Sequence, residues 1–474
     1  MNGAIITIVN QLSVTTTEVA AMSALNALPV NKHYLGKVMD VAETMAVEVI
    51  VDILDVRGMK LVAKGARVTR ALQEKLILHK LKRPFESCVR VRDGVDANTI
   101  VAIAARLIDT SPPVAHILRA TSTGGSSALA HLSRMEFGNA LSLMLTVSQR
   151  NGANALEHAV LVSLLSICMA KKLGLSENDV TIAGLAGLLH DIGELYIDPA
   201  YLARGKRLLP HEWSHIVVHP RIGQMLIDEL GGYPAAVGRA VAEHHERYDG
   251  TGYPRQISGN QISAAGQAVS VAEMIAGVLL KDHPLQRAEL ALKIIPGEHS
   301  HELLSAISGA LRMAGPEQGG DVRALGGESV ERLFWRISTI LEIGRNLLEG
   351  PAAKSPTTRQ LLDTTVGRVR HIQRAFISTG LDVYVRQQPG FNGGCDELLF
   401  EREVACRELQ WRLRDIARDV ALHTTTPDEK IVLAPLVRML DDDRSMAAPA
   451  PVAPPQPKLF TPPANVASVR RYGT

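Results

Sequence analysis

The sequence predicts a mainly α-helical protein, with a helical central domain preceded by a small α/β module and followed by a helical C-terminal region. Hydrophobic residues make up 46% of the 474 residues, but aromatic residues only 4%. The cores must therefore be built mainly from Ala, Leu, Val and Ile, and long stretches rich in Ala and Leu favour helix. A chain of this length exceeds one ordinary core, so we expect about three domains.

Charge and cysteine content argue against several classes of protein. Lys and Arg total 51 against 49 Asp and Glu, and this balance opposes a broad nucleic-acid-binding face, so no DNA partner is expected. The four cysteines show no CxxC spacing, which indicates reduced thiols in a cytoplasmic protein. The N-terminus lacks the basic region of a secretory signal, and the longest apolar run, 159–170, is too short to span a membrane.

Residues 1–95 are expected to form the small α/β module. Residues 47–54 and 59–62 are rich in apolar residues and flank a turn, which predicts a hairpin. Thr69 stands at the N-cap position of a predicted helix, and residues 89–91 add a short strand. We interpret the module as a packing or dimerising domain, with a ligand sensor as the alternative.

Helical patterns dominate the next two regions, a helical connector at 96–150 and the central domain at 151–314. Ser176 and Asp179 form a capping pair for the helix that ends at Leu189. The expected helices of these regions span residues 100–108, 129–147, 154–173, 176–189, 210–219, 220–230, 234–245 and 262–280.

The C-terminal region at 328–442 follows a Gly-rich linker at 315–327. Its expected helices span residues 329–348, 358–377 and 396–422. In the last of them apolar residues recur every three or four positions among charges, which fits a helical bundle and a homodimer contact equally well. Residues 443–474 are rich in Pro and Ala and are expected to be disordered.

Histidines and carboxylates cluster along the central domain. His190-Asp191 ends a predicted helix, His219 follows, and the doublet His244-His245 comes next. Borderline divalent metals prefer this mixture of imidazole and carboxylate, and Asp191 is placed to bridge two of them. Adjacent histidines on a helix diverge by about 100°. The doublet can therefore share one centre only at a helix end, which the nearby Gly250 and Gly252 allow.

A family resemblance rests on three groups of residues: His190-Asp191-Ile192-Gly193, His219, and His244-His245-Glu246 followed by Asp249-Gly250-Thr251-Gly252-Tyr253-Pro254. These resemble the HD-GYP family, helical bacterial metallophosphohydrolases of the HD superfamily that hydrolyse the signalling dinucleotide cyclic di-GMP. The resemblance covers residues 154–295. It implies two divalent metal ions, iron or manganese, held by His158, His190, Asp191, His219, His244, His245 and Glu273.

The resemblance also implies catalytic and substrate-binding positions, some of which depart from the family pattern. The catalytic candidates are Asp191 and Glu194, and Glu194 stands where the family has a lysine; a carboxylate repels phosphate oxygens. Glu273 replaces an aspartate ligand and adds a methylene group. Gln267 replaces an arginine. The substrate-binding candidates are Gly252, Tyr253, Pro254 and Gln267.

The resemblance implies a metal-dependent cyclic di-GMP phosphodiesterase in which a metal-bridged hydroxide attacks phosphorus. The main alternative is a regulatory module that has lost catalysis and binds the nucleotide, or a protein partner through its C-terminal helices or tail. The loss of the lysine, the arginine and the aspartate supports it. A hydrolase of another nucleotide or phosphoester is the third possibility.

Overall fold

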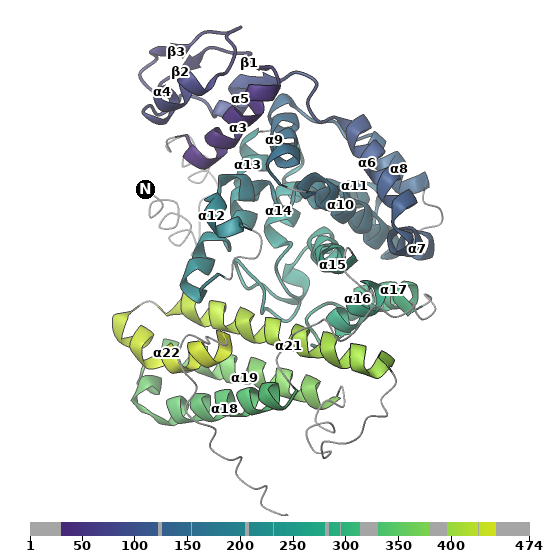
Figure 1. Ribbon diagram of the computed structural model, residues 1–474, viewed down its shortest axis with the longest axis vertical. Coiled ribbons are helices and arrows are strands. Elements are labelled where there is room, and N and C mark those ends of the chain that lie inside the picture. Colours follow the sequence, from purple (N-terminus) through teal and green to yellow (C-terminus); the bar gives the residue numbers. More distant parts are fainter. Residues whose placement is uncertain are drawn as a thin grey trace, which may run out of the picture. The chain divides into compact units, whose positions relative to one another are not determined.

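The computed structural model describes residues 30–121, 126–152, 154–203, 208–230, 232–279, 284–293, 295–312, 330–378, 396–424 and 426–441. The described chain is mainly helical, with two small antiparallel sheets (Figure 1). This confirms the predicted fold class. The expected linker at 315–327 and the expected disordered tail at 443–474 lie outside the described residues.

The N-terminal module, residues 30–95, contains short helices and both sheets. Its elements are α3 (Lys32–Thr44), β1 (Val47–Val49), β2 (Ile53–Leu54), β3 (Lys60–Val62), η1 (Arg70–Leu72), α4 (Gln73–Ile77), α5 (Phe85–Cys88) and β4 (Val89–Val91). Asn31 caps α3 by accepting hydrogen bonds from the backbone amides of His33 and Tyr34. Lys37 of this helix donates a hydrogen bond to a backbone carbonyl of the central domain.

The predicted hairpin is only half right. β2 pairs with β3, as expected, but β1 pairs with β4 instead. The backbone bends at residues 50–52, between β1 and β2. The stretch 47–54 therefore forms two strands with different partners, because the bend breaks the continuity that one ladder requires.

The connector and the central domain form one helical region. Its elements are α6 (Ala97–Thr110), α7 (Pro112–Thr121), α8 (Ser126–Ser133), α9 (Asn139–Asn151), α10 (Ala155–Lys172), α11 (Glu177–Leu189), η2 (Ile192–Tyr196), α12 (Pro199–Leu202), η3 (Pro210–His215), α13 (His219–Leu230), α14 (Ala235–Glu243), η4 (Gly259–Gln261), α15 (Ala264–Leu279), α16 (Pro284–Lys293) and α17 (His301–Arg312). The single helix expected at 129–147 is wrong: residues 134–138 separate α8 from α9, and Gly138 is the N-cap of α9.

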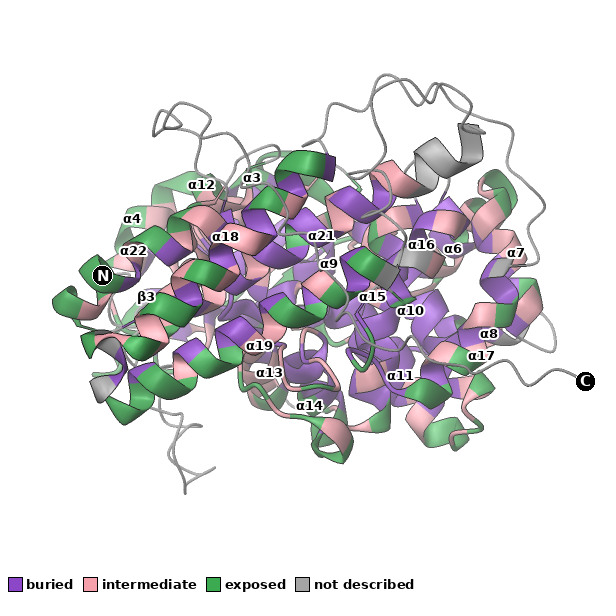
Figure 2. Cartoon of the chain, turned by 90° about the horizontal axis from the view of Figure 1, so that it is seen from below, coloured by how far each residue is buried: buried purple, intermediate pink, exposed green. Residues whose placement is uncertain are grey.

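Three apolar helices form the centre of this region. α10 packs against both α11 and α15, and most of its side chains are buried (Figure 2). Ser163 of α10 donates a hydrogen bond to the Gly184 carbonyl of α11 at 2.6 Å. The hydrophobic core around these helices also includes buried residues of the N-terminal module, such as Tyr34 and Phe85. The module and the central domain therefore share one core.

The C-terminal bundle has a hydrophobic core of its own. It consists of α18 (Val330–Glu349), η6 (Pro351–Lys354), α19 (Pro356–Ser378), α21 (Asp396–His423) and α22 (Pro427–Asp441). α18 packs on α19 and α22, and α21 packs on α19 and α22. The helical-bundle interpretation is therefore the observed one, and α22, which contains Pro435, is a helix that the sequence analysis did not expect.

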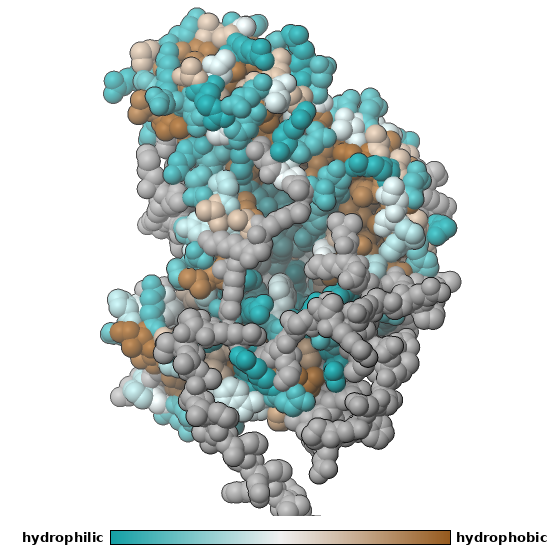
Figure 3. Space-filling view, viewed as in Figure 1, coloured by the Kyte–Doolittle hydropathy of each residue, from teal (hydrophilic) through white to brown (hydrophobic). Residues whose placement is uncertain are grey.

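Hydrophilic side chains cover much of the surface seen in Figure 3, with small hydrophobic patches between them. Val56, Met59 and Leu78 are large exposed apolar side chains of the N-terminal module. Within the described ranges, no single helix combines the length and apolar character needed to cross a membrane. The helix pair Asn139–Arg150 and Ala155–Lys172 reaches that threshold jointly, but the two helices are bent by 119°.

Candidate metal centre

The structure brings all seven predicted metal-ligating side chains together in two adjacent groups. Asp191, His219, His244 and His245 form one group, and His158, His190 and Glu273 form the other. Within each group the potential ligand atoms all lie within 4.8 Å of one another. Such spacing allows each group to surround a cation.

Helix ends position most of these side chains. His190 is the C-cap of α11, His219 is the first residue of α13, and His244 is the C-cap of α14. α14 ends at Glu243, so His244 and His245 leave the helix, and their ring centroids lie 4.1 Å apart. The doublet therefore meets the geometric condition that the sequence analysis set for sharing one centre.

Asp191 lies between the two groups. Its Oδ1 is 3.4 Å from His219 Nε2 and 3.8 Å from His244 Nε2, whereas its Oδ2 is 3.0 Å from His190 Nε2. Each carboxylate oxygen thus faces a different group. This is the arrangement that a carboxylate needs to bridge two cations.

The proton positions of three imidazoles follow from their backbone contacts. The Nδ1 atoms of His190, His219 and His244 lie 2.8, 2.8 and 2.6 Å from the carbonyl oxygen three residues earlier. A carbonyl oxygen can only accept, so each Nδ1 carries a proton, and in the neutral form of each ring the lone pair lies on Nε2. Metal-binding histidines are typically oriented by such a hydrogen bond.

The lone pairs on these Nε2 atoms can bind a metal, whereas two of them facing each other repel. His219 Nε2 and His244 Nε2 lie 3.1 Å apart, a separation that puts two acceptors face to face without a shared proton. Within the described part of the chain, the buried His190 Nε2 has no hydrogen-bond partner of good geometry. A divalent cation in each group would satisfy these atoms, so the residues present fit a metal.

Glu273 reaches the second group despite its extra methylene. Its Oε2 lies 2.9 Å from His158 Nε2 and 3.2 Å from His190 Nε2. The side chains of His158 and Glu273 are 25% and 22% exposed, whereas that of His190 is fully buried. The second group is therefore partly open to solvent, as is the first group at Asp191, whose side chain is 34% exposed.

Burial keeps two imidazoles of the first group neutral. Burial, followed by the neighbouring His219 and His190, lowers the pKa of His244 to about 3. Burial, followed by His244, also lowers the pKa of His245. Neutral imidazole is the form that binds metals.

Carboxylates act in the opposite direction at His190. Burial alone would lower the pKa of His190, but Asp191 and Glu273 outweigh burial and raise it. Burial and then the charge of Asp191 raise the pKa of Glu194 to about 8. Glu194 lies in η2, the short helix that begins directly after Asp191. The backbone carbonyl of Glu194 accepts a hydrogen bond from Lys37 Nζ at 3.2 Å. No sequence signal linked Lys37 to this site.

The predicted substrate-binding residues do not all lie together. The Tyr253 ring stacks on His245 at 4.5 Å, with Pro254 following through a cis peptide bond. Gly252 packs against the backbone of residues 245–247; a Cβ there would lie 2.4 Å from the His245 carbonyl oxygen. The Gln267 side chain instead donates to the Ile262 carbonyl at 3.1 Å. The substrate roles of these residues stay predictions.

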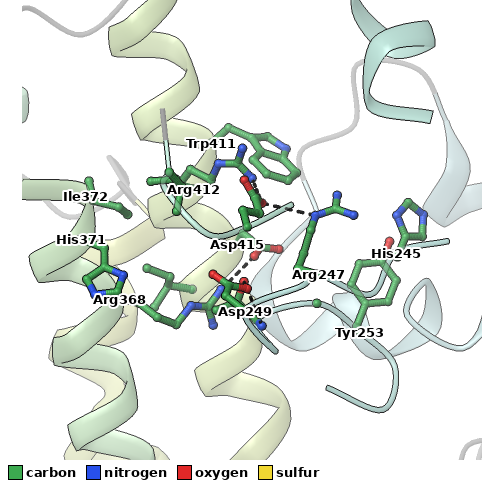
Figure 4. Close-up of a pocket in the computed structure, with 15 residues that line it drawn as sticks. His245, Arg247, Asp249, Tyr253, Arg368, His371, Ile372, Trp411, Arg412 and Asp415 are labelled. Carbon is green, nitrogen blue, oxygen red and sulfur yellow. Dashed lines mark hydrogen bonds and ion pairs between the residues drawn. The ribbon is translucent and has the colours of Figure 1, made fainter. Parts of the chain in front are cut away.

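A cleft opens beside His245 (Figure 4). Its empty space, including the part open to solvent, is about 550 Å³. Residues 245–253 line one side and residues of α19 and α21 line the other. The sequence did not predict that the C-terminal helices lie near the metal centre, since the spacing of their apolar residues indicated only a packing face.

Comparison with known proteins agrees with this geometry. Residues 140–295 match a protein-family model described as HD domain. The cyclic di-GMP phosphodiesterase response regulator RpfG of Xanthomonas campestris pv. campestris is 37% identical over 121 residues, which cover 25% of this chain and 32% of that protein. A cyclic di-GMP phosphodiesterase of Thermotoga maritima is 29% identical over 173 residues, covering 35% of this chain and 47% of that protein.

Other matches have a related description. The 3'3'-cGAMP-specific phosphodiesterase 3 of Vibrio cholerae is 30% identical over 131 residues, covering 28% of each protein. The solved structure of Bd1817, an HDG"Y"P protein from Bdellovibrio bacteriovorus, is 18% identical with a TM-score of 0.32, covering 57% of this chain and 98% of that one. The chain spans less than half the length of the three curated relatives. The segment 140–295 is an HD domain, and the relatives that it matches support its resemblance to the HD-GYP family.

Proposed function

We propose that the protein is a metal-dependent phosphodiesterase that hydrolyses cyclic di-GMP. The observation that carries this proposal is the position of Asp191, whose two carboxylate oxygens face different groups of histidines. The curated relatives named above are described as phosphodiesterases of cyclic dinucleotides, which supports the substrate class.

Two divalent ions, iron or manganese, are the proposed cofactor. His219, His244 and His245 would hold one ion, His158, His190 and Glu273 the other, and Asp191 would bridge them. When bound, such a pair of ions lowers the pKa of water and neutralises phosphoryl oxygens. Imidazole and carboxylate ligands together suit iron and manganese.

The chain's own residues orient the centre. Backbone carbonyls hold the Nδ1 protons of three histidines and thereby aim Nε2 inward. Tyr253, stacked on His245, excludes water from one side of that ring. We place Asp191 and Glu194 at the reacting phosphate, with Glu194 opposing the substrate whenever it is ionised.

The second candidate is a regulatory module that binds cyclic di-GMP without hydrolysing it. Glu194 and Gln267 favour it, because they stand where the family pattern has a lysine and an arginine that contact phosphate. A protein partner would then bind through the C-terminal bundle.

Turnover of cyclic di-GMP by the full chain, loaded with Mn²⁺ or Fe²⁺, separates these functions. Chromatography should show the linear dinucleotide or GMP, and Asp191→Asn should reduce the rate at least a hundredfold, because the bridging oxygens are lost. Binding without product would support the regulatory module instead. Glu194→Lys should raise kcat/KM, and an unchanged or lower value would contradict the assigned repulsion.

A further inference from the structure

The cleft beside the candidate metal centre has walls from two distant parts of the chain. His245 and Tyr253, on one side, belong to the centre and to the loop that follows it. On the other side, α19 contributes Arg368 and His371, and α21 contributes Trp411 (Figure 4). A molecule that reaches His245 through this cleft must therefore pass the C-terminal bundle.

Ion pairs fix the bundle side of the cleft. Arg412 of α21 pairs with Glu298, and the two side chains are only 8% and 5% exposed. Arg368 of α19 pairs with Asp415 at 3.1 Å and with Asp419 at 2.8 Å. The first contact joins α21 to residue 298 outside the bundle, and the other two join α19 to α21 within the wall.

Two further contacts attach α21 to the HD domain. Gln256 Nε2 donates to Asp419 Oδ1 at 2.8 Å. The guanidinium of Arg418 lies over the Trp213 ring, 4.4 Å from its centroid. The bundle is therefore joined to the loop that follows His245 and to η3, and not only to the outer helices.

The pairing of charged groups leaves aromatic side chains as ligand contacts. Arg368 and Arg412 are engaged by carboxylates, whereas Trp411 remains 41% exposed and His371 is exposed. Both line the cleft. Aromatic side chains stack on nucleic-acid bases, so the two are suited to contact a base in this cleft.

We propose that α19 and α21 complete the substrate site, with Trp411 and His371 stacking on a purine base of the nucleotide whose phosphate lies at the metal centre. This inference rests on the proposed function, and it assigns substrate specificity to residues outside the HD domain. The base is the part of the substrate remote from the metals. Stacking on it should change binding more than chemistry.

The test compares Trp411→Leu with Trp335→Leu in the metal-loaded full chain. Trp335 is 53% exposed on α18 and does not line the cleft, so it is the matched control. Trp411→Leu should raise KM for cyclic di-GMP at least tenfold with kcat within about threefold, since base stacking is worth ~1–3 kcal/mol. His371→Ala should raise KM in the same direction, and it provides a second test if Trp411→Leu fails to fold.

Fluorescence supplies a signature that a purely structural role would not produce. Cyclic di-GMP should quench tryptophan emission in the wild type and in Trp335→Leu, and much less in Trp411→Leu. Unchanged KM and quenching in Trp411→Leu and His371→Ala would overturn the inference while leaving the phosphodiesterase intact. A higher kcat/KM in Trp411→Leu would also overturn it, because the bundle would then obstruct the site.

Failure of the proposed function has a different result. If the metal-loaded wild type does not hydrolyse cyclic di-GMP, calorimetry gives its Kd directly. A tenfold weaker Kd in Trp411→Leu would support the stacking inference without catalysis. No binding by the wild type would overturn it.

Discussion

Three buried imidazoles of the candidate metal centre, those of His190, His219 and His244, share the same local hydrogen bond. Each donates its Nδ1 proton to the carbonyl at the end of its own helical turn, so the backbone selects the tautomer that presents Nε2. The helix end and the histidine are therefore one functional unit. The residue three positions before each of these histidines therefore cannot be displaced without turning the ring.

Gly193, the second residue of η2, provides a residue-scale test because it lies close to the backbone at the start of α13. A Cβ at Gly193 would lie 2.1 Å from the His219 carbonyl oxygen, so Gly193→Ala should push η2 away from α13. We expect a loss of about 1–3 kcal/mol in the free energy of unfolding, together with weaker metal binding. Urea denaturation and metal titration measure both effects.

The control is Gly277→Ala in α15, where a Cβ would meet nothing within 4 Å. Alanine should stabilise this exposed helical position by about 0.5–1 kcal/mol. Equal stability of Gly193→Ala and the wild type would contradict the close packing of η2 on α13.

At the scale of elements, the ends of helices proved more predictable than some of their interiors. The capping pair Ser176 and Asp179 begins α11, as expected, with the Asp179 amide donating to Ser176 Oγ at 3.2 Å. The bends at residues 50–52 and 134–138 were not predictable, because strand and helix propensities run through both. Tertiary pairing decides these positions.

The order and spacing of His190-Asp191, His219 and the histidine doublet predicted a metal centre, and the family resemblance added His158 and Glu273. Helix geometry required a helix end at the doublet. The cleft wall could not be predicted in the same way. Trp411 and His371 lie far from the motif in sequence. The ion pair and the hydrogen bond that join α21 to the rest of the chain carry no local signal. Only the folded chain brings them together.

The partly buried Glu229 of α13 makes stability depend on pH. Glu229 of α13 has a buried Oε1 without a hydrogen-bond partner among the described residues. Burial, followed by the charge of Glu86, raises the pKa of Glu229 from 4.5 to about 7. Folding therefore favours the protonated carboxyl, so the contribution of Glu229 to stability is greatest below pH 4.5 and is lost as the pH rises through about 7.

We expect Glu229→Gln to reduce the decrease in Tm between pH 5 and pH 8, because the amide does not ionise. Burial also raises the pKa of Glu246 to about 7, so part of the decrease should remain. Scanning calorimetry at several pH values measures it, with the exposed Glu331→Gln as the control. An identical pH dependence in wild type and Glu229→Gln would contradict this assignment.

At the scale of the whole molecule, a buried ion network joins the C-terminal bundle to the HD domain. Glu298 accepts from Arg412 of α21 and lies 3.3 Å from Arg247 Nε. Arg247 in turn donates to Ser270 Oγ of α15 at 2.6 Å. The network thus connects the cleft to a helix that carries a candidate metal ligand.

Breaking one side of this network should loosen the bundle. Arg412→Leu should cost about 3–5 kcal/mol, because it leaves Glu298 buried with reduced compensation. Hydrogen exchange should then increase in α21 and in residues 245–256. A double-mutant cycle combines this change with Glu298→Gln. The double variant should lose about 0.5–3 kcal/mol less free energy of unfolding than the sum of the losses of the two single variants. Strictly additive costs would mean that Arg412 and Glu298 do not interact.

Metal content tests the central claim most directly. The full chain, purified without chelators and supplied with Mn²⁺ or Fe²⁺, should carry close to two divalent ions per chain, as expected for a paired-metal centre. Asp191→Asn, which alters the carboxylate shared by both groups, should carry fewer than one while remaining folded by circular dichroism. A folded wild type that binds no divalent ion under these conditions, or an Asp191→Asn variant with undiminished metal content, would contradict the account.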